Sequence, residues 1–325
     1  MRTMNDVFRS LLTALMIAAP LIAAAQSAYP SKPIRIVVPY PPGGANDVIS
    51  RIVGDGLTKA LGQQANIDNR AGAGGMIGSQ LVAESAPDGH TLLFTSAAHA
   101  INPALYKKVP YDSVGSFELL TQVAEGTFVL FMHPTIPAQS VRELVALAKR
   151  KPGQLIFASA GIGNATHLAG ELFKLQTGTD LMHVPYKGGG PALIDLLSGQ
   201  VSMYFGTLAA GLQYAKAKRL KPLAVTAKKR SAILPEVPTI AESGYPDYEV
   251  TAWWLMMAPK GTQPSVVSVL NQEIVKHIKS KSPQESLQRQ GIDTVGSSPQ
   301  QATVFLQGEI AKWQEVVRRG KIAVQ

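Results

Sequence analysis

Three glycine-rich segments, residues 39–47, 159–167 and 187–191, stand out as places where the backbone could bind an anion. Each follows a short apolar run and precedes a stretch in which apolar residues recur with helical spacing. Glycine lets a ligand approach the main chain closely, and free N–H groups at a helix start carry partial positive charge. The segments therefore predict strand-to-helix turns whose main-chain N–H groups can hold an anionic group.

Polar residues at the end of the first turn have a structural interpretation. Asn46 or Asp47 is the expected N-cap, because short polar side chains accept hydrogen bonds from the first N–H groups of a helix. Asp47 also lies four residues before Arg51, the spacing of an ion pair on one helix face. Capping and ion pairing are therefore favoured over catalysis. In the third segment, Pro191 is expected at the first helical position.

The glycine spacing does not match a nucleotide site. Gly161 and Gly163 begin a dinucleotide fingerprint, yet Thr166 occupies its third glycine position. Residues 71–75 fail the same test, because Ile77 stands where that glycine should be. No Walker lysine follows any of these segments, so binding of a nucleoside triphosphate is disfavoured.

The sequence also lacks the usual patterns of catalytic and metal sites. It has no cysteine, and its six histidines are dispersed without a pair at metal-ligand spacing. The motifs Gly-x-Ser-x-Gly, His-Glu-x-x-His and Ser-x-x-Lys are missing. His167 lies in a suspected binding segment, where a capping or core role is favoured over proton transfer. We therefore expect no catalytic residue, no metal and no cofactor.

The composition is that of a globular chain. Its 325 residues are 46% hydrophobic and 16% charged, which excludes disorder. Single cores stop growing near roughly 250 to 300 residues, so two lobes are expected. The net charge of +9 favours anionic partners, but the basic residues are scattered and no run of them exceeds three residues, the length of the run at residues 228–230. Nucleic acid is therefore not an expected partner.

Residues 1–25 have the pattern of a secretory signal. Arg2 and Arg9 precede an apolar stretch at residues 11–25, and its last three alanines supply a cleavage site. The alternative is a membrane anchor, but the stretch is shorter than the roughly 20 residues that span a bilayer. We expect cleavage near Ala25 and a mature protein outside the cytoplasm.

From residue 33 onward, short apolar runs alternate with amphipathic stretches, the rhythm of βα units on a parallel sheet. Strands are expected at residues 34–38, 91–95, 155–158, 182–184, 201–205 and 223–226. A long C-terminal helix is expected over residues 299–319. Three further helices face the core with stripes of apolar residues: Val48, Ile49, Ile52, Val53 and Leu57; Leu168, Leu172 and Leu175; and Val267, Leu270, Ile274 and Ile278.

Two more apolar segments, residues 121–131 and 248–257, are strand-like and flanked by Gly or Pro. We interpret them as two crossings between lobes. The expected organisation is then a signal peptide at residues 1–25, a first lobe of residues 26–124 plus 250–325, and a second lobe of residues 125–249.

The run Pro33-Ile34-Arg35-Ile36-Val37-Val38-Pro39-Tyr40-Pro41-Pro42-Gly43-Gly44, with Asp47 and Arg51 behind it, resembles the Bug family of extracytoplasmic solute receptors. These receptors serve tripartite tricarboxylate transporters. Together the matching segments cover essentially the whole mature chain. Those that resemble the family further along are residues 69–75, 87–93, 159–168, 183–188, 223–226, 235–239 and 242–246.

The resemblance implies a type II periplasmic-binding-protein fold, in which two doubly wound α/β lobes close on a ligand cleft. It also implies that a ligand carboxylate is held by main-chain groups and ordered waters rather than by an arginine. The ligand-binding residues that the resemblance implies are Tyr40, Pro42, Gly43, Gly44, Ala45, Asn46, Asp47, Ser96, Ala97, Gly161, Gly163, Asn164, Thr166, His167, Tyr186 and Gly188.

By the same resemblance, the chain is expected to be a periplasmic receptor and a monomer. It would capture a small carboxylate and deliver it to the membrane permease subunits of a tripartite tricarboxylate transporter. Two alternatives stay open: a secreted α/β hydrolase or lyase, and a sensor for a membrane signalling partner. Asn164 replaces the serine common in relatives, and Gly206-Thr207 stands where many relatives carry a polar or acidic residue. The sequence therefore does not specify which carboxylate is bound.

Overall fold

The structure is a computed structural model that describes residues 29–322. The expected signal peptide, residues 1–25, lies outside the described residues. The fold described below lies in the unit Lys32–Gln325. Within the described part of the chain, no helix has both the length and the apolar character needed to cross a bilayer.

A ten-stranded sheet forms the framework of this unit. Its strand order is β2-β1-β3-β9-β4-β7-β5-β6, and β8 and β10 also pair with β4. The strands are β1 (Ile34–Val38), β2 (Ala65–Asn69), β3 (Thr91–Ser96), β4 (Phe117–Met132), β5 (Ile156–Ser159), β6 (Met182–Pro185), β7 (Met203–Thr207), β8 (Lys221–Val225), β9 (Thr251–Pro259) and β10 (Ile292–Thr294).

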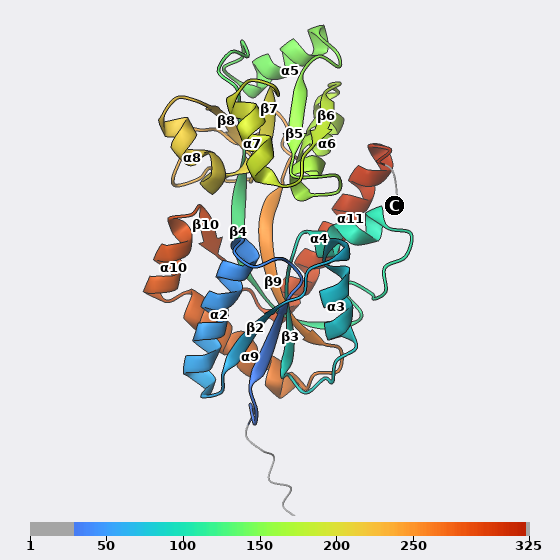
Figure 1. Cartoon of the computed structure of the whole chain (residues 1–325), viewed down its shortest axis with the longest axis vertical. Coiled ribbons are helices and arrows are strands. Elements are labelled where there is room, and N and C mark those ends of the chain that lie inside the picture. The colour runs from blue at the N-terminus through green and yellow to red at the C-terminus, as the bar shows by residue number, and fades with distance from the viewer. Residues whose placement is uncertain (1–28, 323–325) are drawn as a thin grey trace, which may run out of the picture. The chain divides into compact units, whose positions relative to one another are not determined.

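The long strand β4 joins two halves of this sheet. Its residues 117–127 pair with β9, and its residues 128–132 pair with β7. We call β1, β2, β3, β9 and β10 the first half, and β5 to β8 the second half. Figure 1 shows β4 and β9 side by side between the blue and red elements of the first half and the green and yellow elements of the second.

The prediction of parallel βα units is right for the two ends of the sheet and wrong for its centre. β1 is parallel to β2 and β3, and β5 is parallel to β6 and β7. β9 is antiparallel to β3, and β4 is antiparallel to β9 and β7. The parallel ends matter for function, because the carboxyl ends of parallel strands are where α/β proteins bind ligands.

Helices cover the sheet, and the predicted C-terminal helix is confirmed with the same bounds. Its start is fixed by a capping box, in which Ser298 and Gln301 satisfy each other's backbone N–H groups. The helices are α2 (Ala45–Leu61), α3 (Met76–Ala83), α4 (Ala98–Leu105), α5 (Val141–Arg150), α6 (Ala165–Thr177), α7 (Gly189–Leu197), α8 (Leu208–Lys216), α9 (Pro264–Ile278), α10 (Lys281–Gln288) and α11 (Pro299–Arg319), with a short 3₁₀ helix at Ala73–Gly75.

The six predicted strands are confirmed within two residues at each end, and the two predicted crossings lie mostly in β4 and β9. β2 and β10 were not predicted from the sequence. Their segments, Ala-Asn-Ile-Asp-Asn and Ile-Asp-Thr, are short and polar, because β2 is an edge strand and β10 pairs only with β4 among the described strands. Such strands carry little of the apolar signal on which strand prediction depends.

Two details of the helix predictions are wrong. Val48 was expected in the core but is 38% exposed, because Ile49, Val53 and Leu57 form the buried face of α2. Pro191 is the third residue of α7 rather than the first, because Gly188 is the N-cap.

One cluster of buried apolar side chains runs through both halves. It includes Leu93 and Met257 from the first half, Phe157 and Phe205 from the second, and Trp313 of α11. The helix α11 packs against α4 and β4 and also reaches α6. The helix α11 therefore contacts elements of both halves of the sheet.

Candidate functional site

The first glycine-rich turn joins β1 to α2, and its helix begins without a side-chain cap. Gly44 is the N-cap and has extended backbone angles. The prediction that Asn46 or Asp47 is the N-cap is therefore wrong, because both residues lie in the first turn of the helix. The Asp47 carboxylate instead folds back and accepts a hydrogen bond from the Gly43 N–H at 3.1 Å.

The predicted ion pair on α2 is confirmed. Arg51 donates to both carboxylate oxygens of Asp47, at 2.9 and 3.1 Å. This hydrogen bonding is the main reason that the pKa of Asp47 lies below its usual value. The Asp47 carboxylate is buried, and its charge is compensated by Arg51 and by the Gly43 N–H. Asp47 thus holds the turn rather than offering a free carboxylate.

The second glycine-rich turn joins β5 to α6 and is held by side chains from the first turn of that helix. The Asn164 side chain caps α6 by accepting from the Thr166 N–H at 3.0 Å. Thr166 Oγ1 accepts from the Ala160 N–H at 2.8 Å, and His167 Nδ1 accepts from the Gly163 N–H at 3.1 Å. The expected structural role of His167 is confirmed, because its ring fixes the main chain of Gly163.

A histidine pair supports this second turn from beneath. The rings of His167 and His183 stack with centroids 4.0 Å apart, and Phe157 stacks on the His183 ring. Burial lowers the pKa of His167 to about 3 and that of His183 to about 4, so both rings are neutral at pH 7. A neutral His167 can accept a hydrogen bond at Nδ1, which the Gly163 N–H requires.

A third helix start lies at the end of β3. The helix α4 begins at Ala98, its N-cap is Ala97, and no side chain caps it. Ser96 and Ala97, just before this helix, were predicted to bind the ligand. Alanine at the first positions leaves the space in front of the helical N–H groups free of long side chains. An uncapped helix start of this kind can receive an anion.

The starts of α2, α4 and α6 meet at one cavity of about 230 Å³. Six of the predicted site residues line it, from both halves of the sheet: Tyr40, Asn46, Ser96, Ala97, Gly163 and Asn164. Gly161 lines a neighbouring hollow of about 380 Å³, which shares Tyr40, Ala98, Gly163 and Asn164 with the first. We call the first cavity the inner cavity and the second the outer hollow.

The remaining predicted residues do not line either hollow, and four of them, residues 42–45, are exposed. Gly43 and Asp47 brace the first turn, and Thr166 and His167 brace the second. The Tyr186 hydroxyl donates to Asp195 at 2.7 Å, and the Gly188 N–H donates to the Ala160 carbonyl at 3.1 Å. Nine predicted residues are therefore absent from the linings of the two hollows: Pro42, Gly43, Gly44, Ala45, Asp47, Thr166, His167, Tyr186 and Gly188.

Sequence reasoning missed the back wall of the inner cavity. Ile101, Phe128, Ala252 and both residues of the pair Trp253-Trp254 line it. Phe128 lies where β4 passes from the first half to the second, and the tryptophans lie on β9, which pairs with β4 there. The signal available in the sequence was the tryptophan pair inside one of the two expected crossings.

Three residues that line the inner cavity each carry a buried polar atom with no hydrogen-bond partner among the described residues: Tyr40 Oη, Asn46 Oδ1 and Trp254 Nε1. Burial raises the pKa of the Tyr40 hydroxyl, an effect that Ser96 and Thr95 only partly offset. Trp254 is only 5% exposed. Buried polar groups are normally paired, so these three atoms are exceptions within the wall, although they are shielded from the open part of the cavity.

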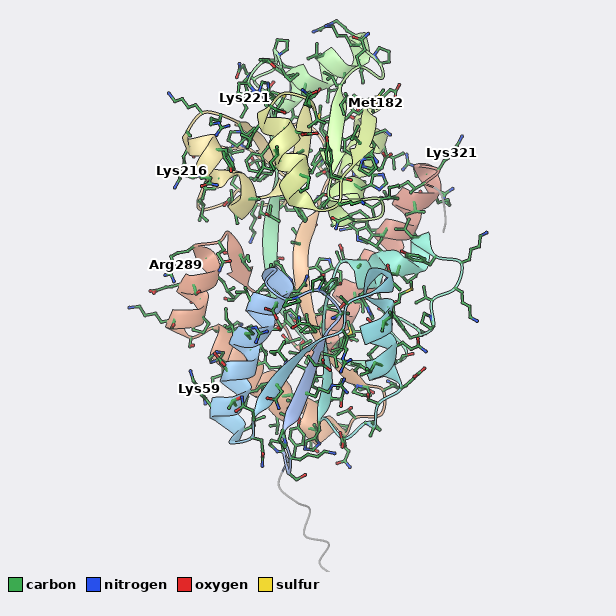
Figure 2. The ribbon with its side chains drawn as sticks, in the orientation of Figure 1. Lys59, Met182, Lys216, Lys221, Arg289 and Lys321 are labelled. Atoms are coloured by element: carbon green, nitrogen blue, oxygen red, sulfur yellow. The ribbon has the colours of Figure 1, made fainter. Side chains whose placement is uncertain are left out.

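The wall carries no charged side chain. Among the described residues lining the inner cavity there is no Asp, Glu, Lys, Arg or His. The basic residues Lys59, Lys216 and Arg289 project from the outer surface in Figure 2. Across residues 29–322, no cluster of three or more histidines or carboxylates is placed to hold a metal ion. The helix starts, which carry partial positive charge, are therefore the groups at the cavity that can attract an anion.

Residues 49–322 match the profile of the family described as the tripartite tricarboxylate transporter family receptor, TctC. The chain belongs to the TctC family. The chain is also 39% identical over 308 residues to protein BugT of Bordetella pertussis, and the match covers 94% of each protein. Together, the family match and this relative confirm the resemblance to the Bug receptors.

Solved structures similar to this TctC-family chain confirm the expected periplasmic-binding-protein fold. One is described as R. palustris Rpa4515 with adipate, which is 34% identical with a TM-score of 0.79 and covers 91% of this chain and 100% of that one. Another, the periplasmic binding protein BugD, is 32% identical with a TM-score of 0.76 and covers 91% and 100%. MatC from Rhodopseudomonas palustris, with bound malate, is 29% identical with a TM-score of 0.75 and covers 89% and 100%.

Proposed function

We propose that this TctC-family chain is a periplasmic receptor that captures a small carboxylate-bearing anion in the inner cavity. The observation that carries the proposal is the meeting of the uncapped starts of α2 and α4 with the start of α6 at one cavity. The relatives whose structures are described with adipate and with malate support a carboxylate ligand.

The energetics of binding do not require a charged side chain. Burying a carboxylate costs several kcal/mol, and each hydrogen bond to a charged group returns about 1.5 to 3 kcal/mol. Three or four donors therefore offset the cost. Main-chain N–H groups at the starts of α2, α4 and α6, which meet at the cavity, can supply these donors.

We further propose that the two halves of the sheet act as two lobes that close on the ligand. The lobes are residues 26–124 plus 250–325 and residues 125–249. The course of β4 supports this division, because its pairing changes from β9 to β7 between residues 127 and 128. Asn46 and Asn164 line the cavity from opposite halves. Closure would bring both side chains into contact with the same ligand.

The receptor is proposed to be a monomer that delivers its ligand to the membrane permease subunits of a tripartite tricarboxylate transporter. Membership of the TctC family supports this partner. The expected signal peptide would place the mature chain in the periplasm. Uptake into cells that carry the permease, with and without the receptor, separates transport from a signalling role.

An enzymatic role is less well supported, although the structure contains a serine–histidine pair that the sequence did not reveal. Ser159 Oγ lies 2.6 Å from His183 Nε2. The Ser159 side chain is fully buried, and its hydroxyl also bonds the carbonyl and N–H of Gly161. This hydroxyl is occupied in holding the turn, so we assign the pair a structural role.

The direct test is calorimetric titration of protein that has been unfolded in guanidinium and refolded to remove any carried ligand. Mono-, di- and tricarboxylates are titrated separately, and the bound acid is recovered and identified by mass spectrometry. We expect micromolar binding of at least one acid, recovered unchanged. If every acid fails to bind, or if the recovered acid has been converted, the receptor proposal is wrong.

A further inference from the structure

Two crossings connect the halves of the sheet, and both change partners at the same level. In β4, pairing with β9 ends at Thr127 and pairing with β7 begins at Phe128. In the other crossing, the Val250 N–H donates to the Thr226 carbonyl at 3.0 Å, and the next residue, Thr251, already pairs with β4. Each crossing therefore passes from one lobe to the other within a single residue step.

One residue, Thr226, bonds both crossings at this level. It directly follows β8, which belongs to the second lobe, and it is fully buried. Its N–H donates to the Phe128 carbonyl at 3.0 Å. Its hydroxyl oxygen lies 2.6 Å from the Val250 carbonyl oxygen and 2.9 Å from that of Phe128. A hydroxyl has one proton to donate, so the shorter contact makes Val250 its main acceptor.

A second bond fastens the same linker to the second lobe. The buried Tyr248 hydroxyl donates to the Ala169 carbonyl of α6 at 2.9 Å. Together with Thr226, this bond holds residues 248–250 on the second lobe as far as the start of β9. Because hinges are a few residues that absorb the change in backbone angles, bending is confined to the step at which each crossing leaves the second lobe.

The bonds of Thr226 also reach the wall of the binding site. Phe128, whose carbonyl accepts from the Thr226 N–H, lines the inner cavity. Phe128 therefore keeps a fixed place on the second lobe while the first lobe moves. Fixing a wall residue and the bending axis in advance raises the fraction of molecules that are competent to bind. The apparent affinity rises with that fraction.

We propose that Thr226 is a positioning residue for ligand capture, whose hydroxyl fastens one crossing to the other so that the lobes close about a single axis. The inference rests on the proposed function, because it assigns Thr226 a role in the proposed closure. Thr226 is not among the described residues that line the inner cavity. It acts through Phe128 and Val250 rather than by touching the ligand.

The movement of the lobes can be measured without a ligand. The chain has no cysteine, so Lys59→Cys and Lys216→Cys introduce two unique labelling sites. Both lysines project from the outer surface in Figure 2, one from α2 of the first lobe and one from α8 of the second. Double electron–electron resonance between nitroxide labels at these sites gives the distribution of distances between the lobes. We expect Thr226→Val to broaden this distribution and Thr226→Ser, which keeps the hydroxyl, to leave it unchanged.

The same substitutions are tested for binding, on unlabelled protein that has been unfolded and refolded to remove any carried ligand. Adipate, malate and citrate are the probes, and each is titrated by calorimetry. For an acid that binds the wild type, we expect Thr226→Val to raise the dissociation constant about three- to tenfold, the effect of one lost hydrogen bond. Thr226→Ser should bind with nearly wild-type affinity, because its hydroxyl can still donate to Val250.

Thr177 provides the matched control in the same lobe. It is also buried, and its hydroxyl donates to the Phe173 carbonyl of α6 at 2.6 Å and contacts the Thr179 hydroxyl. Neither partner belongs to a crossing. Thr177→Val should therefore lower the free energy of unfolding, measured in urea, about as much as Thr226→Val does. It should change neither the distance distribution nor the affinity.

Each outcome decides the proposal. An unchanged distance distribution or an unchanged affinity in Thr226→Val overturns it, and so do equal effects of the valine substitutions at 226 and 177. If Thr226→Val does not fold, Thr226→Ala removes the same hydroxyl. Failure of both to fold shows a purely structural role and also overturns the proposal. If no probe binds the wild type, the receptor function is contradicted, and the ligand-free distances still decide the role of Thr226.

Discussion

The indole N–H of Trp253, at the back of the inner cavity, donates to the Glu309 carboxylate of α11 at 2.8 Å. The same oxygen of Glu309 accepts from the Trp313 indole at 3.1 Å, and Lys312 pairs with the other oxygen. Glu309 is only 7% exposed. One buried carboxylate of the C-terminal helix thus holds Trp253, a residue of the inner cavity's wall that lies 56 positions earlier in the chain.

Replacing this carboxylate is expected to lower both stability and affinity. Glu309→Leu leaves two buried indole N–H groups without an acceptor, so the free energy of unfolding should fall by about 2 to 4 kcal/mol. Glu309→Gln keeps an acceptor oxygen and should cost less. Urea unfolding followed by circular dichroism measures the stability, and titration with the ligand measures the affinity.

A matched control lies on the same helix. Glu315 pairs with Arg318 at the surface, where ion pairs contribute little. Glu315→Leu should therefore change the free energy of unfolding by less than about 1 kcal/mol. Equal effects of the substitutions at 309 and 315 would show that the buried network does not support the cavity wall.

The elements that the sequence predicted well are those whose signal is local. The C-terminal helix was predicted with its observed bounds, because Pro299 follows a capping serine and the apolar spacing continues to Val317. The glycine-rich turns were also found, since glycines between a strand and a helix mark such turns directly. The N-cap of α2 was misplaced because a glycine, Gly44, takes the position that polar residues usually occupy.

The back wall of the site could not be predicted, because tertiary contacts create it. Ile101 and Phe128 have the same apolar character as many core residues, and only the pairing of β4 with β7 and β9 brings Phe128 to the cavity. The buried Ser159–His183 contact likewise joins residues of two parallel strands, β5 and β6. No spacing rule along the chain indicates such a pair.

The Asn164→Asp substitution tests the electrostatic basis of binding. Aspartate caps a helix as well as asparagine does, so α6 should keep its start and the unfolding temperature should stay close to that of the wild type. The new charge lies at the cavity, so the affinity for a carboxylate should fall about tenfold or more at pH 7. It should recover as the pH falls through the pKa of the new aspartate.

The control for this charge is Asn164→Ser, which keeps a neutral cap. It should bind with nearly wild-type affinity, because serine accepts from the same helical N–H groups. If the aspartate and serine variants bind equally well, the site does not recognise an anion at the start of α6.

A substitution at Gly163 tests the contact between the two halves. Gly163 has φ of +73°, and an added Cβ would lie 2.4 Å from a side-chain carbon of Leu105, which belongs to α4. Gly163→Ala is therefore strained and also collides with the opposite half. To relieve this contact, the turn at residue 163 must move away from its place in the cavity wall. We therefore expect the ligand affinity to fall at least about tenfold.

Gly178, at the other end of α6, provides the matched control. It has φ of +63°, and an added Cβ would meet nothing within 4 Å. Gly178→Ala should cost about 1 to 2 kcal/mol of stability from backbone strain alone and leave the affinity unchanged. Loss of affinity in both variants would mean that general destabilisation, rather than the turn, controls binding.

The pH dependence of stability reports on the neutral His167 that holds the Gly163 N–H. Burial lowers the pKa of His167 to about 3, whereas an unfolded histidine has a pKa of about 6.5. Between these values the unfolded chain binds a proton that the folded chain does not. The free energy of unfolding therefore falls as the pH is lowered from about 6.5, by up to about 1.4 kcal/mol per pH unit for this residue, and it is unaffected above that range.

The groups facing His167 do not reverse this sign. Glu171 Oε1 lies 3.8 Å from its Nε2, but that oxygen is paired with Lys174 at 3.0 Å, and the neighbouring His183 ring also has a lowered pKa. In His167→Gln, the amide oxygen can still accept from Gly163 but does not titrate. Urea unfolding between about pH 7 and pH 4.5 should show a steeper loss of stability in the wild type than in the variant. Parallel curves for the two proteins across this range would contradict a neutral His167 beneath the binding turn.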